Sequence, residues 1–243
     1  MQSILRYFGD RLARHLSKPK PGYERFSVLS QAQLAATLEP CDLLLVEGNS
    51  QISTAIKYLT QSTWSHVCLF VGDQDGQGAL LEADLVNGVC RVPLSKYDGY
   101  NVRICRPVRV TDEDKRALIN FAIERIGHQY DTKNIIDLLR YLIATPPVPS
   151  RYRRSLIAFG SGDPTKAICS TLVAQSFQSI KYPILPRELS VQEKKRFYND
   201  QLVMQKRHYS HFTPRDFDLS PYFQIIKPTI SNDFDYQDIK WDE

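Results

Sequence analysis

The chain has 243 residues, of which 42% are hydrophobic and 24% are charged, and its formal net charge is +4. These values are typical of a soluble globular protein with one main domain. The mild positive charge comes without an arginine-rich stripe interleaved with aromatic residues, which argues against a nucleic-acid partner. The five cysteines include no C-x-x-C pair, which argues against a zinc site or a disulfide framework and favours a reducing compartment.

Residues 1–38 are predicted to form an N-terminal helix and a linker. Between residues 3 and 17, apolar residues recur at helical spacing and arginines occupy other positions on the wheel, which predicts a short basic amphipathic helix. The segment lacks the apolar region of a secretory signal, and no apolar run approaches the roughly 18 residues that span a bilayer. We therefore expect a cytoplasmic protein, in which this helix either packs on the domain or lies peripherally on the anionic inner membrane surface.

The middle of the chain predicts short strands at close spacing, followed by helices. Strands are predicted at 41–48, 65–73, 100–107 and 223–227, and two more around an Asn87-Gly88 turn within 78–97. Helices are predicted at 50–62, 111–127, 134–144 and 169–180. These elements predict an α+β fold in which an antiparallel sheet or small barrel packs against helices.

The stretch KAICSTLVAQSF, residues 166–177, raises the question of a nucleophile. Cys169 opens a predicted helix, where unpaired N–H groups and the helix dipole favour a thiolate. A cysteine at such a position is also often a small buried hydrophobic residue, so the position alone does not decide.

A nucleophilic thiol needs a base and a group that orients the base. His66 is the best of the five histidines because it lies in a predicted strand, where it shares one face with Cys68 and Phe70. Glu82 lies in the next predicted strand and is placed to accept the second N–H of the imidazole.

The order of four motifs, SHVCLFVGD, LLEADLVNGV, GHQYD and ICSTLVAQSF, resembles the circularly permuted branch of the NlpC/P60 papain-like superfamily. Within that branch the chain is most similar to the YiiX/YebB-like cysteine hydrolases, with lecithin retinol acyltransferase as a more distant relative. His66 precedes Cys169 here, whereas the cysteine comes first in the unpermuted order. The resemblance runs from about residue 40 to residue 228 and implies a permuted papain-like core.

The resemblance implies that Cys169 is the nucleophile and His66 the base. Glu82 matches the third polar position of the site, and Asp84 and Asp73 are rivals for that position.

Tyr130, in GHQYD, is similar to a family tyrosine that faces the nucleophile, where it would help the Cys169 backbone N–H to bind an oxyanion. The link between these two residues is longer than the family pattern, so residues 131–165, an apolar helix and a basic loop, are taken as an insertion. The insertion either completes the core or covers an acyl chain and an anionic head group. The predicted segments are an N-terminal helix and linker, a catalytic domain and an acidic tail, at residues 1–38, 39–228 and 229–243.

Together these features predict a cysteine hydrolase that cleaves an amide or ester bond of a peptide or lipid through a Cys169 thioester, with His66 as the base. This chemistry needs no metal or organic cofactor, and the His208–His211 pair lacks a nearby acidic ligand pattern. Two alternatives stay open: a thiol acyltransferase that acts on lipid, and a non-catalytic module that binds a membrane or a partner. The sequence leaves the oligomeric state open.

Overall fold

The structure is a computed structural model, and it describes residues 18–19, 27, 29–73, 79–84, 87–128, 168–185, 208–209 and 212–229. The predicted helices at 3–17 and 134–144, the basic loop after the latter, and the tail beyond residue 229 lie outside these residues. None of the helices in the described ranges is long and apolar enough to cross a membrane.

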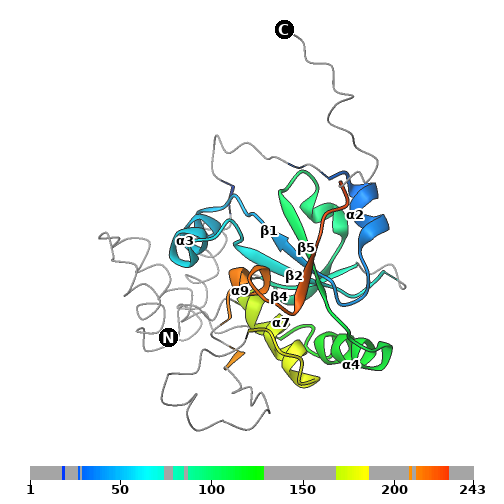
Figure 1. The fold of residues 1–243 in the computed structure, drawn as a ribbon. Coiled ribbons are helices and arrows are strands. Elements are labelled where there is room, and N and C mark those ends of the chain that lie inside the picture. Colours follow the sequence, from blue (N-terminus) through cyan, green and yellow to red (C-terminus); the bar gives the residue numbers. More distant parts are fainter. Residues whose placement is uncertain are drawn as a thin grey trace.

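A six-stranded sheet forms the centre of the described fold (Figure 1). Its strands lie in the order β4 (Gly88–Val92), β3 (Leu80–Asp84), β2 (His66–Phe70), β1 (Leu43–Val46), β5 (Val102–Pro107) and β6 (Phe223–Ile226). Every neighbouring pair is antiparallel. The predicted α+β fold with an antiparallel sheet is therefore confirmed. The small-barrel alternative is wrong, because β4 and β6 are separate edges and the sheet does not close.

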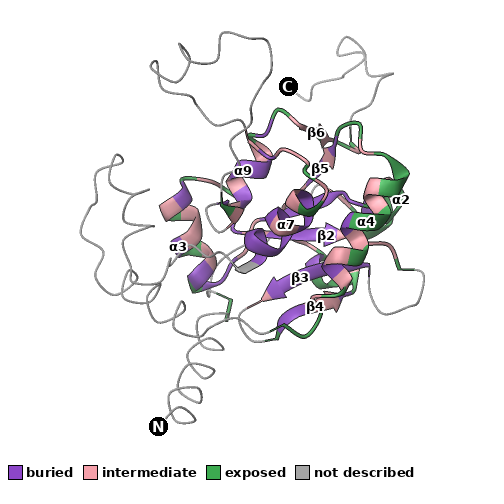
Figure 2. Ribbon diagram, turned by 90° about the horizontal axis from the view of Figure 1, so that it is seen from below, coloured by how far each residue is buried: buried purple, intermediate pink, exposed green. Residues whose placement is uncertain are grey.

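Apolar side chains from both faces of the sheet enter two separate cores. In β2, Val67 and Leu69 join one core, whereas Cys68 and Phe70 join the other, as the alternation of a strand requires. The first core includes side chains of α4 (Asp112–Ile123), α7 (Ile168–Ser179) and α9 (Pro214–Asp218). The second includes side chains of α2 (Gln31–Thr37) and the 3-10 helix η1 (Leu94–Tyr97). Figure 2 shows the consequence, since the central strands and much of α7 are buried.

Two of the helices begin after a capping side chain. Thr111 Oγ1 accepts the N–H of Asp114 at 3.1 Å and begins α4. Ser50 Oγ accepts the N–H of Ser53 at 3.1 Å and begins α3 (Gln51–Thr60). Both helices were predicted from the sequence, and both are a few residues shorter than predicted.

The predicted hairpin is present, but its bounds differ from the prediction. Asn87 lies in the turn and donates its N–H to Asp84 Oδ1 at 2.5 Å, whereas Gly88, predicted in the turn, is the first residue of β4, opposite Asp84, with a φ of 69°. The second strand does not continue to residue 97, because β4 ends at Val92 and η1 follows. Pro93 has no N–H to give to a ladder, which stops the strand. The short helices α2 and α9 were not predicted.

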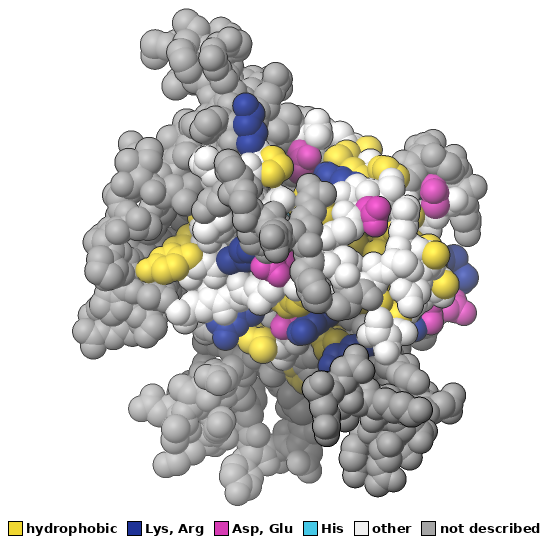
Figure 3. All heavy atoms as spheres, turned by 90° about the horizontal axis from the view of Figure 1, so that it is seen from above, with side chains coloured by type: hydrophobic (Ala, Val, Ile, Leu, Met, Phe, Trp, Pro, Cys, Tyr) yellow, Lys and Arg dark blue, Asp and Glu magenta, His cyan; other side chains and the backbone are white. Residues whose placement is uncertain are grey.

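Charged side chains of both signs are interspersed on the face seen in Figure 3. Lys and Arg side chains lie near Asp and Glu side chains there, so the net positive charge of the chain is not gathered into one patch of the described surface on this face.

The aromatic core beneath α7 gives a test of the packing. Phe177 has no exposed surface, and its ring centroid lies 5.0 Å from that of Phe223 and 5.4 Å from that of Tyr182. We expect Phe177→Ala to lower the free energy of unfolding by about 3–5 kcal/mol, since it removes a large side chain from a packed interior. Chemical denaturation measures the change. Leu219→Ala, at a side chain that is 55% exposed, is the control and should change stability by less than about 0.5 kcal/mol.

Candidate active site

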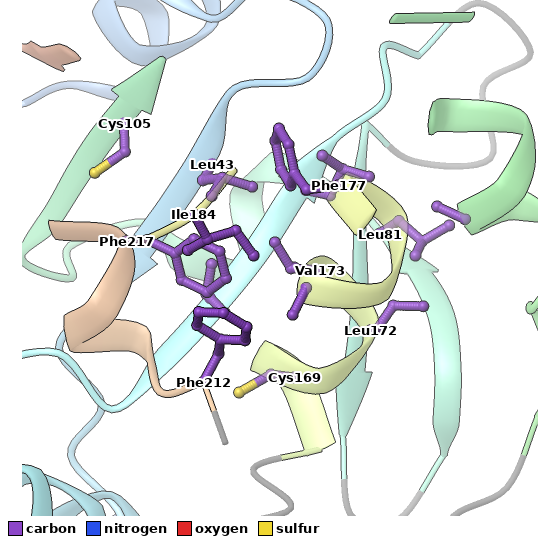
Figure 4. Packing of buried hydrophobic residues seen from close by; sticks show 14 of the residues in the cluster. Leu43, Leu81, Cys105, Cys169, Leu172, Val173, Phe177, Ile184, Phe212 and Phe217 are labelled. Atoms are coloured by element: carbon purple, nitrogen blue, oxygen red, sulfur yellow. The ribbon is translucent and has the colours of Figure 1, made fainter. Parts of the chain in front are cut away.

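Cys169 lies near the beginning of α7, at the edge of the first core. Leu172, Val173 and Phe177 are buried further along the same helix and fix it against the sheet (Figure 4). α7 packs against β2 and β3, so its first turn is held beside the strands that carry the other candidate residues. Cys169 itself is 5% exposed. The first backbone N–H groups of a helix have no partner within the helix, and the Cys169 thiol is hydrogen-bonded to the backbone of Ser170 in this first turn and to that of Val67 in β2.

His66 is the first residue of β2, opposite Val46 of β1. Its side chain is hydrogen-bonded to the side chain of Cys169, and 21% of its side-chain surface is exposed. The other side of the imidazole faces β3, where Nε2 lies 3.1 Å from Glu82 Oε2. Since Glu82 engages Nε2, Nδ1 is the ring nitrogen left for a thiol.

The loop beside His66 is held by a close approach of backbone and serine side chains. Ser65 Oγ accepts the N–H of Gly48 at 2.9 Å, and the Ser65 N–H is donated to the Val46 carbonyl at 3.1 Å. A Cβ on Gly48 would lie 2.2 Å from Ser53 Oγ, so the loop fits only glycine there. This packing fixes the strand end from which His66 projects.

Glu82 is the most enclosed charged group of the site, with none of its side chain exposed. Besides His66 Nε2, its carboxylate accepts hydrogen bonds from Lys96 Nζ and Tyr97 Oη, both from η1. Cys68 Sγ also lies 3.5 Å from Glu82 Oε2. A carboxylate with this many donors is stabilised in its charged form, although it is buried.

The electrostatics of the five thiols separate Cys169 from the others. Burial raises the pKa of Cys41 and Cys105 to about 12 and that of Cys90 to about 11, and it also raises the pKa of Cys68. Burial acts in the same direction on Cys169, but the charge of His66 and hydrogen bonds to His66 and to the backbone outweigh it, so the pKa of Cys169 is lowered. A lowered pKa is what a nucleophilic thiol needs.

The pKa of the His66 imidazole and the pKa of the Glu82 carboxyl group are shifted in opposite directions. Burial alone lowers the pKa of His66, but its interactions with the sulfur atoms of Cys68 and Cys169, through charge and hydrogen bonding, outweigh burial and hold that pKa well above its usual value. Burial alone raises the pKa of Glu82, but hydrogen bonds and charges from His66 and Lys96 outweigh it and hold the pKa well below its usual value. The arrangement therefore favours an imidazolium between a thiolate and a carboxylate.

The structure brings together three of the residues predicted from the sequence, namely Cys169, His66 and Glu82. Of the rivals for the third position, Asp84 instead holds the hairpin turn and lies 4.0 Å from Lys96. Asp73 is exposed and lies three residues after the end of β2. Tyr130 lies outside the described residues.

Three further residues of the site were not identified as such from the sequence: Cys68, Lys96 and Tyr97. Cys68 was placed on the His66 face but given no role. Lys96 and Tyr97 fell within a predicted strand, and the signal that places them elsewhere is Pro93, which ends β4.

Among the residues that the structure describes, two groups of side chains have the composition of metal ligands. His66, Cys68 and Glu82 offer ligand atoms within 4.8 Å of one another, and so do Glu82, Asp84 and Cys90. Both groups share Glu82, whose charge is already balanced by the Lys96 ammonium. A metal ion would have to compete with that ammonium, so the residues fit a proton-transfer cluster better than a metal centre. Of the predicted H-x-x-H pair, His208 is described and His211 lies outside the described residues.

Comparison with known proteins agrees with the papain-like arrangement of the site. Residues 37–141 match the family model described as permuted papain-like amidase enzyme, YaeF/YiiX, C92 family. The match confirms the predicted resemblance to circularly permuted papain-like, YiiX-like proteins, and it supports an enzyme of the cysteine-dependent hydrolase class. The matched segment contains His66 and Glu82 and ends before Cys169.

A solved structure from Escherichia coli O157:H7, described as metalloprotein yiiX, is similar to the chain. It is 17% identical, and the similarity covers 78% of this chain and 96% of that chain with a TM-score of 0.48. No curated protein gave a significant match.

The pairing of Cys169 with His66 gives a direct test in the absence of substrate. We expect the iodoacetamide reaction of Cys169 to follow an apparent pKa below the roughly 8.5 of a free thiol, and His66→Ala to raise that pKa, because the imidazolium stabilises the thiolate. Peptide-resolved mass spectrometry across a pH series separates the five thiols.

His128→Ala is the matched control, since His128 is an exposed histidine at the end of the α4 segment, and it should leave the profile unchanged. A Cys169 profile like that of a free thiol, with no response to His66→Ala, would contradict the assignment.

Proposed function

We propose that this protein is a cysteine hydrolase that opens an amide or ester bond through a thioester on Cys169. The observation that carries the proposal is the placement of the His66 imidazole between the buried Cys169 thiol, with which it interacts, and the buried Glu82 carboxylate, which lies 3.1 Å from Nε2. A thiol that serves only packing needs no imidazole, and an imidazole that serves only packing needs no buried carboxylate.

In the proposed reaction His66 takes the Cys169 proton before or as the thiolate attacks the substrate carbonyl carbon. The new S–C bond places negative charge on the carbonyl oxygen, and the N–H groups at the beginning of α7 supply donors for it. The His66 imidazolium then gives its proton to the leaving amine or alcohol, and the bond to that group breaks. A thioester remains on Cys169.

The second half of the reaction releases the acyl group. Water enters beside His66, which removes a proton as the water oxygen attacks the thioester carbonyl. The C–S bond breaks, the carboxylic acid leaves, and the thiol is restored. Glu82 accepts the N–H of Nε2 throughout, so it holds the imidazole in one orientation and stabilises its charged form. Tyr130 is proposed to line the oxyanion side.

Two features argue for catalysis over a non-catalytic binding role. Burial of the Glu82 carboxylate, with a half-buried imidazole and a partly exposed ammonium as its partners, carries a desolvation cost that an apolar side chain would not have. The pKa shifts of Cys169 and His66 are also those that prepare a thiol for attack. The acyltransferase alternative shares the first half-reaction and differs only in the acceptor that takes the acyl group.

The proposal is tested with peptide amides, aryl esters and phospholipids as substrates. Since the thioester forms on one sulfur, we expect Cys169→Ala to lower kcat/KM by at least roughly 10³-fold. An acyl adduct should be seen by intact-mass spectrometry on the wild-type chain and be lost in the variant. A free acid as the product indicates hydrolysis, and an acylated acceptor indicates transfer.

The matched control is Cys105→Ala, which removes another buried thiol, on β5, and should retain both activity and adduct. Activity that survives Cys169→Ala would overturn the proposal.

A further inference from the structure

We infer that Lys96 and Tyr97 are positioning residues of the same site, which hold Glu82 as an oriented carboxylate against His66. The inference rests on the proposed function, because it assigns a task to the residues behind the proposed base. Neither residue touches the reacting thiol in the described contacts, so each acts through Glu82.

The two carboxylate oxygens of Glu82 have different partners. Oε1 accepts a hydrogen bond from Lys96 Nζ, which also makes the ion pair. Oε2 accepts from Tyr97 Oη and lies 3.1 Å from His66 Nε2. The ammonium therefore places a positive charge beside Oε1, while the phenol fixes the direction of Oε2, the oxygen that faces the imidazole.

Tyr97 is itself held in place by aromatic contacts. Its ring centroid lies 6.0 Å from that of His66, with 37° between the planes, and 5.9 Å from that of Tyr100, with an edge-on geometry. The Tyr97 residue is 8% exposed and belongs to the second core. A phenol packed in this way cannot leave the carboxylate without disturbing the imidazole.

The local sequence explains how two neighbouring residues reach one carboxylate. β4 ends before Pro93, and η1 (Leu94–Tyr97) turns the chain back over β3. Glu82 lies opposite Cys90 in the hairpin, so the turn of η1 brings Lys96 and Tyr97 back to it from the far end of β4. A strand that continued to residue 97 would have carried both side chains away.

The charge on Glu82 depends on groups from four elements. The titratable groups that act on it are His66 and Cys68 of β2, Asp84 of β3, Cys90 of β4, and Lys96 and Tyr97 of η1. Lys96 is the one lysine among them, Cys68 donates its S–H to Oε2, and Asp84 lies 4.0 Å from the same Lys96 ammonium. His66 and Lys96 together hold the pKa of Glu82 low against burial, so loss of the Lys96 ammonium removes one of the two opposing positive charges and moves that pKa upward.

A protonated Glu82 stabilises the His66 imidazolium less, and the imidazolium in turn stabilises the Cys169 thiolate less. On the acid side of the profile, the alkylation rate of Cys169 rises with pH as the thiolate forms. This rise, the acid limb, should therefore move to higher pH when Lys96 loses its charge. A role for Lys96 in packing alone would lower stability or rate without moving that limb.

The experiment compares Lys96→Gln, Lys96→Met and Lys96→Arg by the pH dependence of Cys169 alkylation. We expect both neutral variants to react on the order of 10-fold more slowly on the acid side, equal to about one pH unit of displacement. Lys96→Arg keeps the charge and should keep the limb near its wild-type position. If Lys96→Met does not fold, Lys96→Gln keeps a donor for Oε1 and still removes the charge.

The control is Lys115→Met on α4, a half-buried lysine 3.8 Å from Asp112, and it should leave the profile unchanged. An unmoved acid limb in folded Lys96→Gln overturns the role of Lys96. Because alkylation needs no substrate, this failure differs from failure of the proposed function, in which wild-type Cys169 itself would titrate as a free thiol.

The phenol is tested separately by Tyr97→Phe, which keeps the ring and removes the hydroxyl. We expect kcat to fall on the order of 10-fold with KM unchanged, since the loss affects the orientation of the base and not the binding of substrate. Tyr58→Phe, at a 44% exposed tyrosine of α3, is the matched control. An equal fall of kcat in both variants, or no fall in Tyr97→Phe, overturns the role of Tyr97.

Discussion

The rest of the site depends on one constraint, a carboxylate without exposed surface that must remain charged. Glu82 lies in a central region of the sheet, where an isolated carboxyl group would take up a proton. It stays charged because an imidazole, an ammonium and a phenol surround it. The imidazole comes from β2, and the ammonium and the phenol both come from η1, so the charge on one side chain links the sheet to η1 and, through His66, to Cys169 of α7.

The two-sided sheet makes this arrangement feasible. A sheet with one face in water would solvate Glu82, and neither its partners nor its orientation would be fixed. Here α2 and η1 cover the face that carries Glu82 and Cys68, while α4 and α7 cover the other. His66 is the first residue of β2, so its imidazole lies where the strand ends and reaches both the carboxylate of one core and the thiol at the edge of the other.

Much of this arrangement could be predicted from the sequence, because its parts are local patterns. The His66 strand, the Asn87-Gly88 turn and the helix start at Cys169 each follow from a few neighbouring residues, and the motif order placed them in one fold. What could not be predicted is which distant side chains converge on Glu82. Lys96 and Tyr97 reach it through a change of direction at Pro93, and the alternation of a strand pattern hides such a turn. Asp84 was a rival to Glu82 on sequence, and the structure places it at the hairpin turn, where it accepts the Asn87 N–H.

The position of the carboxylate also explains which of two thiols is activated. Cys68 and Cys169 both interact with the His66 imidazole, so the imidazole alone does not choose between them. Cys68 lies on the Glu82 side, 3.5 Å from Oε2, where burial and the negative charge of Glu82 oppose a thiolate. Cys169 receives the charge of His66 together with hydrogen bonds from the backbone of Val67 and Ser170, and these outweigh the effect of burial. The carboxylate thus has two effects: it stabilises the imidazolium for the thiol on the far side of the ring, and it keeps the nearer thiol protonated.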